Sequence, residues 1–211
     1  MQAFIRPEQF NLLRFQAFKL IRARSTSHDQ NVIQAVTSLV KEKTMGEFRH
    51  CSEEELSLIK PLFQVREEEQ VEEVLSQLKL YVIPFRITEK EVKKLFPKTK
   101  KMKIPNLDTM DVRRRSYLTW RDPGAQKKYL VIMRNEKWIG IEGSFKKETQ
   151  KGICTICNSY QSIGLFLVEI KGKEKGTYKK KGNYICSDGE VCNHNLSSLD
   201  YLYDFVDRLR K

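Results

Sequence analysis

The sequence predicts an α+β fold in which an N-terminal antiparallel helical bundle precedes an α/β domain. Over roughly the first 84 positions apolar residues recur with the 3.6-residue spacing of helices. Beyond Arg115 the pattern changes to short, strand-length apolar runs. Four of the five cysteines form two pairs late in the chain. We place the domain boundary at Pro84, which gives residues 1–84 and 85–211, with the cysteine-bearing part at about 150–211.

Four helices are predicted in the first part. The first begins near Pro7, and the second is capped by Ser27 or Asp29. The third opens with a capping box formed by Ser52 and Glu55, and the fourth begins at about Glu67. Their inward faces are expected to carry Phe10, Leu13, Ala17, Leu20 and Ile21; Val32, Ile33, Val36, Leu39 and Val40; Leu56 and Ile59; and Val71, Val74, Leu75 and Leu78. The connections are short, so neighbouring helices should pack antiparallel, and we interpret the apolar stripes as core rather than as a partner-binding groove.

The second part starts with a short helix from Thr88 to Phe96, where Thr88 and Glu91 repeat the capping-box spacing. A basic stretch follows, and then strands are predicted. They cover Ser116–Trp120, Tyr129–Met133, Lys137–Gly143, Gly164–Ile170 and Thr177–Ile185, with a hairpin around Arg134–Glu136. A helix over about 198–210 closes the chain, with Leu199, Leu202, Phe205, Val206 and Leu209 at core spacing.

Composition indicates a globular protein with an acidic or polyanionic partner. Hydrophobic residues make up 40% of the 211 residues and charged residues 31%, whereas the formal net charge is +12. Such a charge favours RNA, a membrane surface or an acidic protein as partner; the alternative is that the lysines only maintain solubility. No targeting segment or membrane span is expected, so we predict a cytoplasmic location, where paired cysteines are metal ligands more often than disulfides.

The cysteine spacing predicts a structural zinc site. Cys154 and Cys157 form a CxxC pair, which lets a tight turn aim two sulfurs at one ion, and Cys186 and Cys192 complete a tetrahedral set. A CxxC turn, a β-hairpin and then ligands leading toward a helix is the order of a treble-clef zinc finger. We therefore expect one structural Zn²⁺ bound by four thiolates.

Other interpretations of the cysteines are weaker. A redox CxxC would normally open a helix in a thioredoxin-like unit, and a catalytic zinc keeps one position open for water. Two disulfides would need an oxidising compartment. His194 could replace Cys192 as the fourth ligand, although the four-cysteine set is already complete.

No catalytic set emerges from the sequence. The three histidines are scattered, and neither a nucleophile–base pattern nor a glycine-rich phosphate loop is present. We expect a binding protein, not an enzyme.

Several blocks resemble the FusB-type elongation factor G-binding proteins. They are Lys151–Asn158, Lys179–Asp188, Val92–Pro105, Ser116–Trp120, the strand from Lys127, and the closing stretch from Leu202, and together they run nearly end to end. The resemblance implies a helical bundle followed by an α/β domain with a four-cysteine treble clef. It also implies a protein that binds elongation factor G on the ribosome and promotes its release, including when fusidic acid has trapped it, which confers fusidic acid resistance or rescues translation.

The resemblance also implies a contact surface. Lys181, Tyr184 and Phe205 match family contact positions, and Ile153 stands where the family has an aromatic residue. Phe205 could equally be a core residue of its helix. The alternative function is an RNA-binding zinc-finger protein that contacts rRNA near the factor-binding site. Its phosphate contacts would come from Lys98, Lys100, Lys101, Lys103, Arg113, Arg114 and Arg115. In either case a monomer is expected.

Overall fold

The computed structural model describes residues 2–99, 101–172, 174 and 177–210. The chain divides into two compact units, residues 1–84 and 85–211, and each is described by itself. None of the described helices combines the length and the apolar character needed to cross a bilayer.

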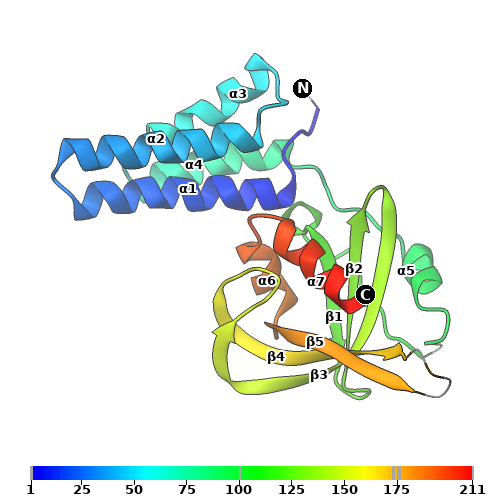
Figure 1. Cartoon of the computed structure of the whole chain (residues 1–211). Coiled ribbons are helices and arrows are strands. Elements are labelled where there is room, and N and C mark those ends of the chain that lie inside the picture. Colours follow the sequence, from blue (N-terminus) through cyan, green and yellow to red (C-terminus); the bar gives the residue numbers. More distant parts are fainter. Residues whose placement is uncertain (1, 100, 173, 175–176, 211) are drawn as a thin grey trace. The chain divides into compact units, whose positions relative to one another are not determined.

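The first unit is helical (Figure 1). Its elements are α1 (Pro7–Thr26), α2 (Gln30–Glu47), α3 (Glu53–Ile59), a 3₁₀ turn (Lys60–Phe63), α4 (Glu68–Leu78) and a second 3₁₀ turn (Lys79–Tyr81). The predicted capping box at α3 is present, because the Ser52 hydroxyl accepts from the Glu55 amide and the Glu55 carboxylate accepts from the Ser52 amide. Asp29, not Ser27, caps α2 by accepting from the Asn31 amide.

The core of this unit lies between the apolar faces of the helices. Leu13, Leu20, Val71 and Leu78 are buried in it, as their helical spacing predicts. The α2 prediction is wrong at two positions, because Val32 and Leu39 are exposed. Only a narrow stripe of α2, with the buried Val40 and Thr44, faces the bundle, so apolar spacing alone overestimated the width of its inner face.

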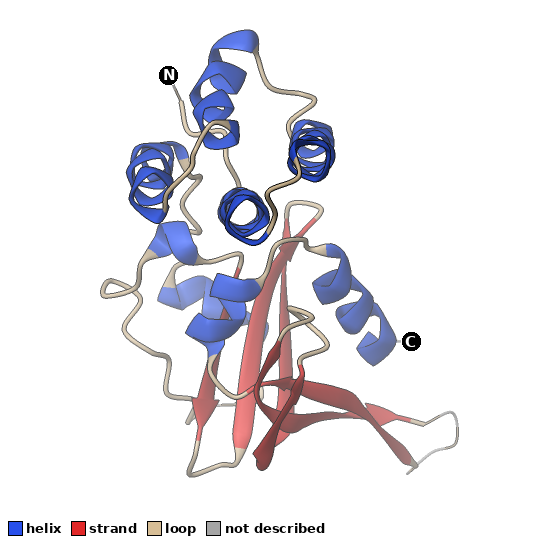
Figure 2. Cartoon of the chain, turned by 90° about the vertical axis from the view of Figure 1, so that its left-hand side faces the viewer, coloured by secondary structure: helices blue, strands red, loops and turns tan. Residues whose placement is uncertain are grey.

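The second unit contains a five-stranded antiparallel sheet in the order β1-β2-β3-β4-β5 (Figure 2). The strands are β1 (Tyr117–Asp122), β2 (Lys127–Arg134), β3 (Lys137–Ile153), β4 (Tyr160–Lys171) and β5 (Tyr178–Cys186). Three helices accompany them: α5 (Glu89–Leu95), α6 (Gly189–Asn195) and α7 (Asp200–Arg210), together with a 3₁₀ turn at Val112–Arg114. The predicted α+β class is therefore confirmed.

Both faces of the sheet are covered at β2. Leu130 and Ile132 pack into the core that contains α7, whereas Tyr129 and Val131 pack into a second core with Val92 of α5. This alternation follows from the two-residue period of a strand, and it explains why β2 is continuously apolar from Tyr129 to Met133. A side chain on β2 is thereby assigned to one layer or the other by its position alone.

The hairpin between β2 and β3 turns at Asn135 and Glu136, both with positive φ (48° and 58°). Two residues of this kind suit the right-handed twist of a tight hairpin. β3 runs ten residues beyond the predicted end at Gly143, since its polar second half, which has no alternating pattern, pairs with β4 across an irregularity between Lys147 and Lys151.

The helix α6 was not predicted. Asp188 begins it by accepting hydrogen bonds from the amides of Glu190 and Val191, an N-cap that the sequence contains but that seven residues without an apolar stripe did not reveal. Helix α7 was predicted, and its buried face, which includes Leu202, Val206 and Leu209, lies in the same core as β2 and β4.

Candidate metal centre and partner surface

Four buried cysteines come together in the second unit. The Sγ atoms of Cys154, Cys157, Cys186 and Cys192 all lie within 4.8 Å of one another. The Sγ–Sγ distance is 3.8 Å between Cys154 and Cys192 and 3.6 Å between Cys157 and Cys186. A tetrahedral zinc with Zn–S bonds of about 2.3 Å requires sulfurs about 3.8 Å apart, so the four side chains fit such an ion.

Three separate segments supply these sulfurs. Cys154 and Cys157 lie on the turn between β3 and β4, which we call the knuckle (residues 154–159); Cys186 ends β5, and Cys192 lies on α6. Asn158 takes the positive φ (52°) that closes the knuckle, and its amide donates to the Cys154 carbonyl. Among the described residues the ligand group consists of these four cysteines and does not include His194.

Hydrogen bonds hold the knuckle against the edge strand β5. The amide and the hydroxyl of Thr155 both donate to the Tyr184 carbonyl, each at 2.9 Å. The Cys186 amide donates to the Sγ of Cys154 at 3.2 Å. The sulfur of one segment therefore accepts from the backbone of another, which favours its thiolate form.

The thiols influence one another strongly. Hydrogen bonds with the other three thiols lower the pKa of Cys154, whereas hydrogen bonds with Cys154 and Cys157 raise the pKa of Cys186 and of Cys192. Four crowded groups of this kind cannot all ionise unless a cation is bound among them. Burial is the main reason that the pKa of Tyr117 lies well above its usual value. The neighbouring Cys192, which accepts a hydrogen bond from the Tyr117 hydroxyl, raises this pKa further.

Cys51 lies in the first unit and takes no part in the cluster. Burial, followed by the neighbouring Glu55 carboxylate, raises the pKa of its thiol. It therefore stays protonated at neutral pH, as expected of a thiol with no part in metal binding.

Two residues that support the site were not identified from the sequence. Lys128 on β2 is 2% exposed, and its Nζ donates to the carbonyls of Cys186 (3.0 Å) and Ser187 (2.9 Å). Asn193 follows Cys192 and is buried; its amide group accepts from the Tyr117 amide and donates to the Tyr117 carbonyl, so it fixes α6 to β1. The sequence offered only a lysine in a Lys-Lys pair and an asparagine near a ligand, and neither pattern is specific.

The expected partner-binding residues fall into two groups. Tyr184 is 40% exposed and Ile153 is 56% exposed, and the knuckle lies next to both. Tyr160 lies directly opposite Ile153 in the β3–β4 register and is 64% exposed. Ile153 and Tyr160 thus form an exposed apolar pair at the base of the knuckle, although Tyr160 was not predicted.

Lys181 and Phe205 form the second group. Lys181 is half-buried on β5, and Phe205 on α7 is only 2% exposed, with its ring 6.1 Å from that of Phe166. Both residues line a cavity of about 330 Å³ between β5 and α7. The burial of Phe205 favours the core alternative, because the helical spacing that predicted a buried face includes this position.

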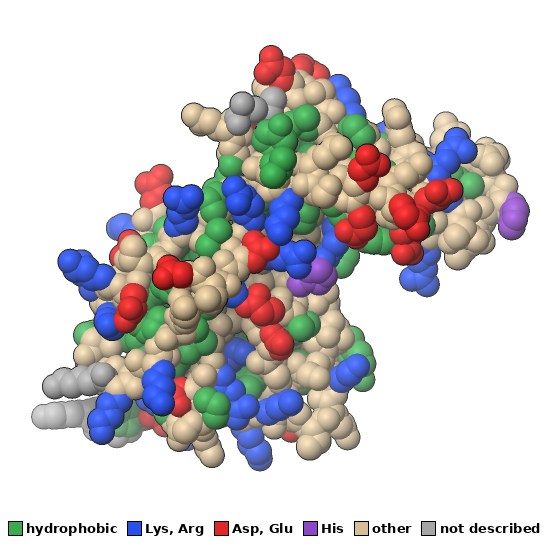
Figure 3. Space-filling view, turned by 180° about the vertical axis from the view of Figure 1, so that it is seen from behind, with side chains coloured by type: hydrophobic (Ala, Val, Ile, Leu, Met, Phe, Trp, Pro, Cys, Tyr) green, Lys and Arg blue, Asp and Glu red, His purple; other side chains and the backbone are tan. Residues whose placement is uncertain are grey.

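The basic residues considered for rRNA contact differ in their exposure. Lys98, Lys101, Lys103, Arg113 and Arg114 are exposed, and Lys100 lies outside the described residues. Arg114 pairs with Asp111. Arg115 is buried in an ion pair with Glu190, so its inclusion among the residues predicted to contact rRNA is corrected. On the face drawn in Figure 3, acidic side chains are interspersed among the basic ones.

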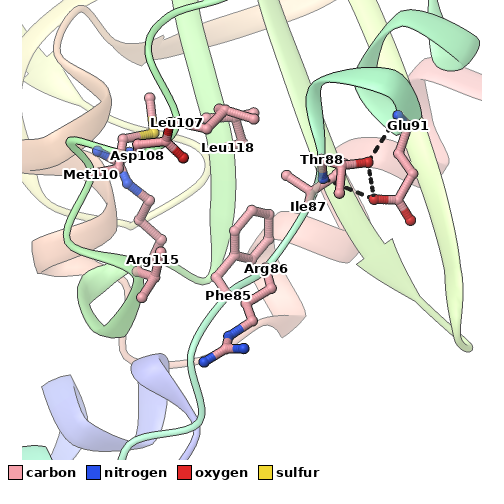
Figure 4. A pocket seen from close by; sticks show the side chains of 11 residues that line it. Phe85, Arg86, Ile87, Thr88, Glu91, Leu107, Asp108, Met110, Arg115 and Leu118 are labelled. Carbon is pink, nitrogen blue, oxygen red and sulfur yellow. Dashed lines mark hydrogen bonds between the residues drawn. The ribbon is translucent and has the colours of Figure 1, made fainter.

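A cavity of about 590 Å³ lies among residues 85–91, 107–112, Arg115 and Leu118 (Figure 4). Much of its lining is apolar, with Phe85, Leu107 and Leu118 among the residues. Its Thr88 and Glu91 side chains form the capping box of α5, and Arg115 pairs with Glu190. These polar groups therefore make contacts that stabilise the fold.

Substituting Phe205 by Ala tests which role its side chain has. We expect Phe205→Ala to lower the free energy of unfolding of the second unit by about 3–5 kcal/mol, because it removes a buried ring. The matched control is Tyr201→Ala on the same helix, where an exposed side chain should cost less than about 1 kcal/mol. Chemical denaturation of the full chain measures both; equal small losses would contradict a core role.

Comparisons with known proteins agree with this architecture. The family model described as "Elongation factor G-binding protein, N-terminal" matches residues 4–86, and "FBP C-terminal treble-clef zinc-finger" matches residues 94–200. A solved structure, described as that of the fusidic acid resistance protein FusC, is similar with a TM-score of 0.88 and 30% sequence identity, over 98% of each chain. No curated protein matches the sequence. The predicted resemblance is confirmed, and the chain belongs to the elongation factor G-binding proteins with an FBP C-terminal treble-clef zinc finger.

Proposed function

We propose that this chain binds elongation factor G through its zinc-finger unit and promotes release of the factor from the ribosome, including complexes stalled by fusidic acid. The observation that carries the proposal is the match of both family models, in order, together with the similarity to FusC along nearly the whole chain. A partner of this kind accounts for the net charge of +12, since opposite charge speeds association with an acidic protein. It also agrees with a cytoplasmic location.

The metal in this proposal is one structural Zn²⁺ held by Cys154, Cys157, Cys186 and Cys192. Four thiolates fill a tetrahedral shell and leave no position for water, so the ion would cross-link the chain and would not act as a Lewis acid. The cross-link joins the knuckle, the end of β5 and α6. An energetic contribution of roughly 10–16 kcal/mol is typical of such sites and is large enough to decide whether this region folds.

The proposed contact surface is built around the knuckle. Tyr184, Ile153 and Tyr160 are exposed there, and exposed aromatic residues next to lysines are frequent energetic anchors of interfaces. Tyr160 would supply the aromatic ring that Ile153 lacks. Lys181 belongs to the surface through its position on β5, whereas Phe205 would support it from beneath as a wall of the cavity that Lys181 also lines.

Metal content and a ligand substitution test the zinc site. The purified chain should contain about one zinc ion per molecule by elemental analysis. Cys157→Ser should unfold the region after about residue 150, because three thiolates bind the ion less tightly, and should leave the helices of the first unit intact. Near-UV circular dichroism and thermal unfolding follow the change; spectra and stability like those of the wild type would contradict a structural zinc.

Binding to purified elongation factor G tests the surface. Tyr184→Ala should weaken binding by about 2 kcal/mol, roughly 30-fold in Kd, if the ring is a central anchor. Tyr178→Ala is the matched control, since it removes an exposed tyrosine from the other end of β5 and should leave Kd unchanged. A folded Tyr184→Ala variant with unchanged affinity would remove this residue from the contact. All measurements are made after nuclease treatment, and binding that nuclease abolishes would instead indicate an RNA partner.

Release requires its own measurement. Ribosomes that carry labelled elongation factor G and fusidic acid should lose the factor faster when the chain is added, and the Tyr184→Ala variant should need a correspondingly higher concentration for the same rate. The reason is that a ligand accelerates departure only through a complex that it forms. Tight binding without any change in the release rate would leave the binding proposal standing and reject the release step.

A further inference from the structure

Lys128 is a buried lysine whose surroundings need an explanation. It lies on the layer of β2 that faces the cysteines, two residues before Leu130 of the same core. Its Nζ donates to two carbonyls at the end of β5 and lies 4.8 Å from the centre of the Phe145 ring. An ammonium removed from water in this way is costly unless opposite charge is close by.

Carboxylates do not provide that charge by direct contact. Within the described part of the chain, Lys128 forms no ion pair with an aspartate or glutamate, whereas its neighbour Lys127 pairs with Glu142. The group that its Nζ contacts is instead the carbonyl of Cys186, whose sulfur lies within 4.8 Å of the other three cysteine sulfurs. The lysine is therefore bonded to the backbone of one of the four clustered cysteines.

We propose that Lys128 is a positioning residue that balances the charge of the metal centre. The inference rests on the zinc site proposed above. A divalent ion held by four thiolates leaves a net charge of about −2 in a buried site. A cation fixed on the central sheet lowers the cost of burying that charge, and its two hydrogen bonds hold the Cys186–Ser187 backbone in the orientation that brings the Cys186 sulfur to the ion.

The site has few other groups that could balance the negative charge of the metal centre. Among the described residues, the sulfurs receive two kinds of hydrogen bond: backbone amide bonds from Cys186 and Cys157 to Cys154, and a hydroxyl bond from Tyr117 to Cys192. Neither group carries a positive charge. Lys128 is a buried cation that hydrogen bonds hold next to the cluster. Its neighbour Lys127 bonds to Glu142 instead and therefore provides the matched control.

The test uses the zinc-loaded full chain with Lys128→Met, which keeps most of the length of the side chain and removes its charge. Competition with a chromophoric chelator should give a zinc affinity roughly 10–100-fold lower than that of the wild type. Iodoacetamide should alkylate the bound thiolates faster, because an uncompensated thiolate is a better nucleophile. Lys127→Met should match the wild type in both measurements. Circular dichroism verifies that each variant is folded.

The outcomes separate this proposal from the zinc site itself. A wild-type chain without zinc would reject the site before Lys128 is considered. A folded, zinc-loaded Lys128→Met variant with wild-type affinity and alkylation rate would reject the role of Lys128.

Failure of Lys128→Met to fold is resolved with Cys157→His, which lowers the negative charge of the site by one. If Lys128 balances charge, Lys128→Met should fold in the Cys157→His background. If it unfolds equally there, the lysine is needed only for the fold and the proposal is wrong.

Discussion

The convergence of four buried sulfurs is the constraint on which the C-terminal half of the second unit depends. β5 is an edge strand, and of its nine residues only Ile185 and Cys186 are buried. A strand that buries so little apolar surface gains little from the hydrophobic effect. It is held instead by its pairing with β4, by the hydrogen bonds from Thr155 of the knuckle, and by the hydrogen bond from the Cys186 amide to the Cys154 sulfur. A tetrahedral ion at that point would supply the cross-link that a larger core supplies elsewhere in the sheet.

Bringing four cysteine sulfurs together in a buried site also has an electrostatic cost. Four cysteines that bound an ion as thiolates would share a buried core with Tyr117 and Phe145, where water screens little, so their charge would have to be balanced within the protein. In the fold proposed here, Lys128 meets that need from β2, a strand that is paired on both sides and covered on both faces. A lysine placed on a peripheral loop could satisfy the same charge but could not hold the backbone at Cys186. The structural position of Lys128 thus links the stability of the sheet to that of the metal centre.

Sequence patterns predicted the parts of the fold that depend on local periodicity or on ligand chemistry. Helical spacing located α1 to α5 and α7, and the CxxC pair identified the cluster, because both signals reside in neighbouring residues. Other features depend on tertiary contacts. The exposure of Leu39, the extension of β3 and the burial of Lys128 and Arg115 are decided by segments distant in sequence. For the same reason, the sequence left Phe205 open as a core residue or a contact residue. Its helical spacing fits a buried face, but the cavity that it lines is formed together with β5, which lies far away in sequence.

The geometry of β5 also constrains how a partner would approach. Lys181 and Tyr184 are three residues apart on one strand, so their side chains leave opposite faces of the sheet. A partner that contacts both must therefore reach around the edge of β5. It cannot do so by adding a strand at Tyr184, because the carbonyl of that residue already accepts from Thr155. Recognition would rest on side chains presented by a rigid edge, and a rigid edge loses little conformational freedom on binding. The metal centre, which fixes that edge, would then contribute to affinity without contacting the partner.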